Sequence, residues 1–422
     1  MNNIILEKHK LPILKSEKLL KKNKILAIKN TDNNFEVEKS KGYKNATSNL
    51  YEDYARIQFK DILTQAIYKD ASDIHIEPFE DEIVIRIRID GKLSKMMTIV
   101  KESYSFLLTV IKLDSGMNIT EKRLPQDGRM DKKIDDIMVD IRTSTMPTIY
   151  GEKVVLRILN RQSLIKEKSE LGFSKQAIQK IENIISKKSG ILLVTGSTGS
   201  GKTTTVYSIL KDLLNGNKNI MTIEDPVEYK IKGINQIQVN DKIGFTFEVG
   251  LRSILRQDPD IIMIGEIRDI ETAKIAIRAA STGHLVISTM HTNNAISSIN
   301  RLIEMKLPPY LISSSLIGII SQKLVRKKCN NCNNTEIKDE LYEEKNKDIE
   351  FLCEKCEDTG YNGRSAMYEI LEISDSLKQY INNWTNCNTT LDTYIKDEMI
   401  TFNDSAKYLI ENNITTIQEC CI

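Results

Sequence analysis

Residues 196–203 constrain this chain more than any other segment, because they read Gly-Ser-Thr-Gly-Ser-Gly-Lys-Thr between an apolar run and a helical pattern. In that context the glycines let backbone N–H groups close around phosphate oxygens at the positive end of the helix. Lys202 neutralises the charge of the β- and γ-phosphates, and the Thr203 hydroxyl ligates Mg²⁺. The segment predicts a site for ATP and Mg²⁺ that consists of Gly196, Ser197, Thr198, Gly199, Ser200, Gly201, Lys202, Thr203 and Thr204.

The region around this motif predicts an α/β nucleotide domain over residues 170–325. Its strands are short, continuous apolar runs separated by helical patterns, which is typical of a parallel-rich sheet covered on both faces. The predicted strands are 191–195, 220–223, 261–264 and 285–289.

Residues 51–165 show a different pattern and predict an α+β domain. Apolar residues at helical spacing in 51–68 indicate an amphipathic helix. Isoleucine at every second position in 83–89, followed by Asp90-Gly91, indicates a half-buried antiparallel hairpin. Residues 1–50 have no sustained period and predict a loosely ordered or small accessory segment. Further predicted elements are a helix over 104–113 and strands over 137–141 and 154–159.

The overall charge balance bears on the class of partner. The 60 lysines and arginines nearly cancel the 58 aspartates and glutamates, and only 6% of the residues are aromatic. A nucleic-acid motor is expected to carry a basic stripe with interleaved aromatic residues, so this composition argues against direct contact with nucleic acid. The sequence contains no run of about eighteen apolar residues, so we expect a cytoplasmic protein without an inserted helix.

Carboxylates follow two of the predicted strands. Residues 222–228 contain Glu224, Asp225 and Glu228, and one of these is a candidate to orient an attacking water. For Glu228 a solvated loop position is the competing interpretation. Glu266 follows the strand 261–264, where a carboxylate would meet hydrated Mg²⁺.

Two histidines flank the predicted strand 285–289. His291 follows the strand and so belongs to the same sheet edge as the phosphate loop, whereas His284 precedes it. A histidine at a strand end is usually a structural hydrogen-bonding group, but one beside the phosphate loop can sense the γ-phosphate. His291 is therefore the better functional candidate.

Four of the seven cysteines form two Cys-x-x-Cys pairs separated by twenty residues. This spacing is the pattern of two knuckles that close one tetrahedral zinc site, and it predicts a structural insert over residues 326–360. A redox pair without metal is the alternative. Cys387, Cys420 and Cys421 lack such spacing and are interpreted as inert thiols. The predicted zinc ligands are Cys329, Cys332, Cys353 and Cys356.

These segments together resemble the secretion ATPase superfamily that drives type II secretion and type IV pilus assembly. Residues 71–78, 123–129 and 144–147 look like the N-terminal domain of that family, so the resemblance covers residues 51–422. The four core segments, in order, look like its Walker A, Asp, Walker B and His boxes and lie at 196–203, 222–228, 258–266 and 282–292.

The resemblance implies a fold and a set of roles. The fold is a RecA-like P-loop domain preceded by a PAS-like α+β domain, with the cysteine insert and a C-terminal helical region over 361–422. Glu228 becomes the general base and Glu266 the Walker B carboxylate. Arg142 and Arg157 become arginines that the N-terminal domain swings onto the phosphates. From the residues alone, a strand position with a solvated head is favoured for both arginines.

The resemblance also extends to the assembly. It implies a homo-hexamer at the cytoplasmic face of the inner membrane, attached peripherally through a platform protein, and it points to assembly or secretion rather than retraction because of the cysteine insert. Many assembly members carry a large domain before the shared region, whereas residues 1–50 precede it here. Three further arginines match family positions near the nucleotide or the subunit interface: Arg252, Arg256 and Arg268.

Two other functions compete with a motor for pilus or pseudopilus assembly. A RecA-like nucleic-acid motor would use the cysteine knuckle and the N-terminal segment as its contact surface. A nucleotide-binding regulator without hydrolysis would keep the phosphate loop as a switch. Intact Lys202, Thr203, Glu228 and Glu266 argue against the regulator.

Overall fold

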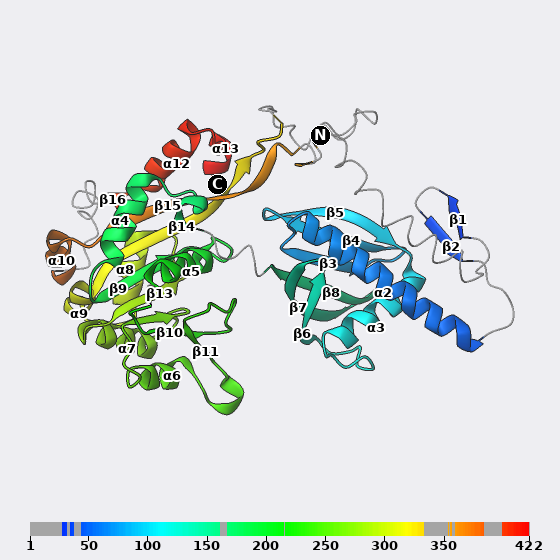
Figure 1. Ribbon diagram of the computed structural model, residues 1–422, viewed down its shortest axis with the longest axis horizontal. Helices are drawn as coiled ribbons and strands as arrows, with labels where there is room; N and C mark the ends of the chain where they lie inside the picture. Colours follow the sequence, from blue (N-terminus) through cyan, green and yellow to red (C-terminus); the bar gives the residue numbers. More distant parts are fainter. Residues whose placement is uncertain are drawn as a thin grey trace.

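The computed structural model describes residues 28–31, 34–37, 44–160, 167–214, 216–332, 353, 355–356, 359–383 and 399–421. Within these residues two large sheets form two bodies, with the N-terminal body in blue to teal and the second in green to red (Figure 1). A small antiparallel pair, β1 (Ile28–Thr31) and β2 (Asn34–Val37), lies in the segment that we predicted to be loosely ordered. Cys387 lies outside the described residues.

The N-terminal body is an antiparallel sheet with two helices on one face. The helices are α2 (Lys44–Tyr68) and α3 (Lys101–Asp114), and their apolar residues pack against the inward isoleucines of the sheet. The predicted hairpin is confirmed, and its turn residues Asp90 and Gly91 both have positive φ. The strand order is β5-β4-β3-β8-β7-β6, with bounds β3 (Asp73–Pro78), β4 (Ile83–Ile89), β5 (Lys92–Ile99), β6 (Gln126–Ile134), β7 (Ile137–Thr148) and β8 (Gly151–Asn160).

The pattern did not predict strand β6. It is an edge strand in which Met130 and Ile134 are the buried positions, so most of its side chains are polar. Its pairing with β7 nevertheless runs from Gln126↔Thr145 to Ile134↔Ile137 without interruption. An edge strand of this kind forms through backbone pairing and carries little hydrophobic signal.

The second body contains the predicted parallel strands in the order β11-β10-β12-β13-β9-β14, followed by antiparallel β15 and β16. The four predicted strands are confirmed as β10 (Ile220–Glu224), β12 (Ile261–Ile264), β13 (Leu285–Met290) and β9 (Gly190–Thr195), each buried at every position. The additional parallel strands are β11 (Asn235–Gln238) and β14 (Leu316–Lys328).

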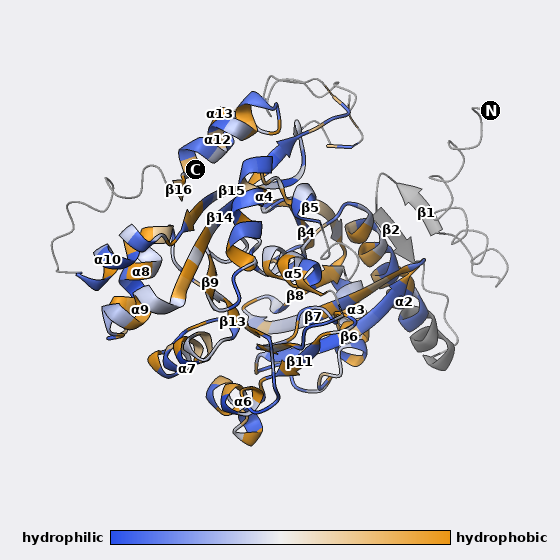
Figure 2. Cartoon of the chain, turned by 60° about the vertical axis from the view of Figure 1, so that its left-hand side comes forward, coloured by the Kyte–Doolittle hydropathy of each residue, from blue (hydrophilic) through white to orange (hydrophobic). Residues whose placement is uncertain are grey.

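Helices cover both faces of this sheet, as the continuous apolar strands require, and two apolar clusters lie between helices and strands. Figure 2 shows hydrophobic residues along β9 and β14. The helices and short turns are η1 (Lys168–Leu171), α4 (Lys175–Ile185), α5 (Lys202–Leu213), η2 (Asp241–Ile243), α6 (Phe247–Ile254), α7 (Ile270–Ser281), α8 (Ala295–Glu304) and α9 (Pro309–Ser315).

The C-terminal part differs from the helical region that we predicted for 361–422. It begins with the strand β15 (Tyr361–Glu372), which pairs with β14 along almost its whole length. Residues 365–371 of this strand are all buried, so the apolar run belongs to the sheet rather than to a helix. The remaining elements are α10 (Asp375–Asn382), β16 (Met399–Ile400), α12 (Phe402–Glu411) and α13 (Ile417–Cys420).

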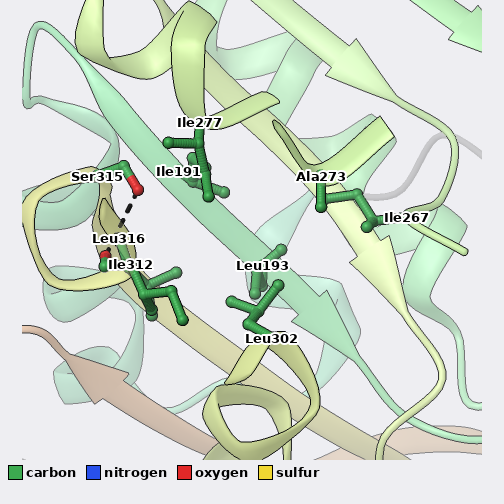
Figure 3. A pocket seen from close by; sticks show the side chains of 9 residues that line it. All are labelled: Ile191, Leu193, Ile267, Ala273, Ile277, Leu302, Ile312, Ser315 and Leu316. Atoms are coloured by element: carbon green, nitrogen blue, oxygen red, sulfur yellow. Dashed lines mark hydrogen bonds between the residues drawn. The ribbon is translucent and has the colours of Figure 1, made fainter. Parts of the chain in front are cut away.

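A small cavity of about 10 Å³ lies beside β9, lined by Ile191, Leu193, Leu302 and other apolar side chains (Figure 3). Its one polar side chain, Ser315, donates its hydroxyl to the carbonyl of Leu311. A cavity this small and apolar has no place for a nucleotide. It is a small packing gap in the core beside β9.

Candidate functional site

The phosphate loop joins the end of β9 to the start of α5. Gly196, Gly199 and Gly201 have φ of 146°, 78° and 88°, which side chains with a Cβ rarely adopt. The Lys202 ammonium donates to the carbonyls of Gly196 and Ser197 at 2.8 and 2.9 Å, so the lysine spans its own loop. Burial lowers the pKa of Lys202, and the nearby Glu266 carboxylate acts in the opposite direction.

Glu266 follows the carboxyl end of β12. Strands β12, β13 and β9 are adjacent and parallel, so Glu266 lies at the same edge of the sheet as the phosphate loop that follows β9. Its carboxylate contacts the guanidinium of Arg268, and its Oε2 lies 3.2 Å from His291 Nε2. Arg268 also approaches Asp225, at 3.8 Å. The sheet topology thus brings together the predicted Glu266 and His291 with one of the three further arginines.

Glu224 and Glu228 have different environments although both lie in the predicted acidic segment. The Glu224 side chain is buried and accepts hydrogen bonds from Tyr207, Thr222 and Gln236. These partners occupy its oxygens, and its contact with Tyr207 ties β10 to α5. Glu228 instead has a side chain that is 31% exposed, so it retains access to water.

The partner of Glu228 comes from the other body. Arg142, on β7, reaches its carboxylate with both terminal nitrogens, at 2.5 Å (Nη2 to Oε2) and 3.4 Å (Nη1 to Oε1). A paired arginine and carboxylate of this geometry form a strong, charge-assisted contact. Two residues that the resemblance implied to be catalytic, from separate domains, are therefore already in contact.

Arg142 belongs to a row of charged residues across the open face of the N-terminal sheet. In register it lies between Arg129 on β6 and Arg157 on β8, and Arg157 in turn lies opposite Asp73 on β3. Arg129 pairs with Asp140. The Arg157 Nε lies 3.1 Å from Asp73 Oδ1, and its side chain is 62% exposed.

The other candidates have local partners. His284 lies at the opposite end of β13 from His291, with its Nδ1 2.8 Å from the Ala279 carbonyl, so it caps the turn after α7. Arg252 pairs with Glu248 on the same helix, and Arg256 donates to the Arg252 carbonyl. A polar groove at the amino ends of β10 and β11 lies at the other edge of the sheet from the phosphate loop.

Sequence reasoning missed two polar residues beneath the phosphate loop. Ser321 and Gln322, on β14, are almost fully buried and contact Thr195 and Ser200. In the sequence, the one sign of these residues is that a polar pair directly follows the apolar run 316–320.

The four predicted cysteine ligands converge. Their sulfurs all lie within 4.8 Å of one another, with 3.8 Å between Cys329 and Cys353 and 3.4 Å between Cys332 and Cys356. Metal–sulfur bonds of about 2.3 Å in a tetrahedron place sulfurs about 3.8 Å apart, so this donor set fits a metal ion. The backbone N–H of Cys356 lowers the pKa of the Cys353 thiol, whereas burial raises that of Cys356.

Comparison with known proteins fits this site. The family model described as "Type II/IV secretion system protein" matches residues 52–421. The chain belongs to this family. The type IV pilus assembly ATPase PilB of Thermus thermophilus is 45% identical over 382 residues, which cover 88% of this chain and 43% of that protein. The type II secretion system protein HxcR of Pseudomonas aeruginosa is 47% identical over 320 residues, covering 76% of this chain and 66% of that protein.

Two solved structures share the fold. The pilus retraction motor PilT, solved with ADP, is 26% identical with a TM-score of 0.60, and the match covers 86% of this chain and 95% of PilT. DotB of Legionella pneumophila is 20% identical with a TM-score of 0.64, over 91% of this chain and 96% of DotB, and shows the fold alone. Among the described residues, none of the helices combines the length and apolar character that a membrane crossing needs.

Proposed function

We propose that this chain is a Mg²⁺-dependent ATPase that powers assembly of a type IV pilus or a type II secretion pseudopilus. The observation that carries the proposal is the Arg142–Glu228 contact, because it joins the N-terminal sheet to the phosphate-loop domain at the predicted general base. The family membership supports the same activity. The chain spans less than half of PilB and 66% of HxcR, so their functions are transferred here as proposals.

In this mechanism the groups of the phosphate-loop domain hold the nucleotide. The loop N–H groups and Lys202 would bind the phosphates, and the Thr203 hydroxyl would hold Mg²⁺, which supplies charge neutralisation there. Glu266, which contacts Arg268 and His291, would bind the hydrated metal. Glu228 accepts the proton of the attacking water. Arg142 and Arg157 neutralise charge on the γ-phosphoryl group when the N-terminal domain closes. Arg142 is bound to Glu228 in the structure, so a move of its guanidinium onto the γ-phosphoryl group would break this contact.

The cysteine cluster is proposed to hold zinc. Four thiolates match the preference of Zn²⁺ for tetrahedral sulfur ligands and leave no open coordination position, so its role would be structural. The presence of this cluster favours assembly or secretion over retraction. We further propose a homo-hexamer that associates peripherally with the cytoplasmic face of the inner membrane through a platform protein.

The proposal is tested in cells by replacing the chromosomal gene with one that encodes Glu228→Gln and scoring surface filaments and secreted proteins. We expect both the filaments and the secretion that depend on this gene to disappear while the protein accumulates normally. Filaments and secretion at the parental level would overturn the assignment. The genes beside this one provide an independent check, since a platform protein and prepilins would indicate the pathway.

A nucleic-acid motor is separated from this function by one measurement on the purified protein. The proposal predicts that DNA leaves the rate of phosphate release unchanged at moderate salt. Stimulation by DNA that declines steeply with salt would favour the nucleic-acid motor instead.

A further inference from the structure

Two strands outside the four core segments, β14 and β15, connect the phosphate loop to the cysteine cluster. Strand β14 passes beneath the loop at Ser321 and Gln322 and ends at Lys328, immediately before Cys329. Strand β15 returns beside it from Tyr361, so the two form a continuous ribbon (Figure 1). We call this pair the β14–β15 ribbon.

The middle of the ribbon contacts the phosphate loop directly. The side-chain amide of Gln322, which is 1% exposed, donates to the carbonyl of Ser200 at 2.7 Å. A Cβ added at Gly196 would lie 2.3 Å from the Gln322 carbonyl oxygen, so the loop and the strand are already in backbone contact. The Ser321 hydroxyl lies 2.5 Å from that of Thr195, the last residue of β9.

The Gln322 contact has a consequence for phosphate binding. In a planar trans peptide the C=O and the following N–H point in opposite directions. Anchoring the Ser200 carbonyl on the Gln322 side chain therefore aims the N–H of Gly201 away from that side chain, and we expect this N–H to donate to a phosphate. The Gln322 Oε1 is buried without a hydrogen-bond partner among the described residues, which costs free energy, so an apolar residue would serve better if packing were its only role.

The far end of the ribbon is held by the N-terminal domain. Asp90, in the β4–β5 turn, accepts a hydrogen bond from the backbone N–H of Gly363 at 2.7 Å, and its other oxygen lies 3.3 Å from Arg364 Nε. Arg364 lies opposite Arg326 on β14. Arg326 stacks on the Tyr361 ring at 4.0 Å and pairs with Glu419 at 2.5 Å, which stiffens this end.

We propose that Gln322 is a positioning residue for the phosphate loop, and that the β14–β15 ribbon couples this positioning to the Asp90 contact with the N-terminal domain. ATP binding at the loop and the placement of the N-terminal domain then influence each other through the ribbon, at a point distinct from the Arg142–Glu228 contact. The inference rests on the proposed use of ATP, but it concerns nucleotide affinity and can be tested without turnover.

The first test measures the affinity of the full chain for a fluorescent ATP analogue, with Mg²⁺, in the parent and in Gln322→Met. Methionine keeps the length and volume of the side chain while removing its donor. We expect affinity to fall about tenfold, with kcat at saturating ATP changed much less. The matched control is Gln176→Met on an exposed face of α4, which we expect to bind as the parent does. If the role of Gln322 were purely structural, Gln322→Met would lower thermal stability and leave the affinity of the folded protein for the ATP analogue unchanged. That result would overturn the proposal.

The second test measures coupling. Asp90→Gly removes the contacts of the Asp90 carboxylate with Gly363 and Arg364, and the Gly-Gly sequence that results suits the turn. We expect Asp90→Gly to weaken affinity about threefold in the parent and to have no further effect in Gln322→Met, because the contact to the loop is already lost. The control is Asp81→Asn in the exposed β3–β4 turn. Equal effects in both backgrounds, or no effect in either, would contradict the coupling. Tight analogue binding without phosphate release would instead count against the proposed function alone.

Discussion

The two large sheets carry chemistry in different places. The central strands of the parallel sheet are buried at every position, so functional groups such as Glu266 and His291 lie beyond the strand ends. The N-terminal sheet has helices on one face only, and its other face presents Arg142 and Arg157 from the middle of strands. A sheet covered on both faces is confined to chemistry at its edge, whereas a half-covered sheet can use a whole face.

Among variants within the two sheets, the largest effect is expected at the open face of the N-terminal sheet. Arg142→Gln should lower kcat about 1,000-fold, because the proposed neutralisation of charge on the γ-phosphoryl group is lost. Arg157→Gln should have a smaller effect, since Asp73 holds its guanidinium. The control is Arg86→Gln, on the same face and paired with Glu77, which should leave kcat near the parental value. Steady-state phosphate release at saturating Mg²⁺-ATP provides the measurement. Loss of activity in Arg86→Gln equal to that in Arg142→Gln would break the comparison.

The second effect concerns burial in the parallel sheet. Leu193→Ala, in fully buried β9 beside the small cavity, should lower the free energy of unfolding by about 3 kcal/mol, because it removes buried methyl groups and enlarges a void. Ser144→Ala, on the open face of β7, should change it by less than about 0.5 kcal/mol. Urea unfolding followed by circular dichroism compares the two variants. Similar losses for both would show that the two sheets are not covered differently.

The smallest effect depends on pH. Burial alone would raise the pKa of Glu77, but hydrogen bonds from Arg86 and Lys153 outweigh it and bring the pKa to about 2. Because the folded pKa lies below the unfolded one of about 4.3, this carboxylate stabilises the fold above that pH. The contribution is lost as the pH falls through the range from about 4 to 2. After allowance for the solvent-exposed partners we expect about 1 kcal/mol.

Glu77→Gln should remove this contribution. Its free energy of unfolding should therefore be lower than that of the parent at pH 7, and the two values should converge near pH 2. Urea unfolding between pH 2 and pH 7 measures the difference. The matched control is Glu80→Gln, an exposed position in the β3–β4 turn, for which the difference should stay near zero throughout. A constant difference for Glu77→Gln across this range would contradict the assigned cause.

Strong local patterns made much of the fold predictable. Short sequence patterns of a few residues each predict the phosphate loop, the four apolar strands and the Asp90-Gly91 hairpin. The β6 edge strand did not, because its polar sequence forms through backbone pairing with β7. Strand β15 was assigned to a helical region; a continuous buried stretch gives no periodicity that separates a strand from a helix.

For the site, the sequence identified the candidate residues but not their present partners. Arg142 and Glu228 are 86 positions apart, and their contact depends on how two domains meet. Arg157 stays a prediction, now with Asp73 as its partner. The role of Gln322 had no motif to reveal it, since its contact with Ser200 arises from strand order in the sheet.

The most direct test of the account is phosphate release by purified Glu228→Gln at saturating Mg²⁺-ATP, with affinity for a fluorescent ATP analogue measured in parallel. The account predicts that kcat falls about 100- to 10,000-fold, because the proposed general base is lost, while the affinity changes less than about threefold. Glu248→Gln, an exposed acid paired with Arg252 on α6, should hydrolyse ATP at the parental rate. Hydrolysis by Glu228→Gln at the parental rate would contradict the account.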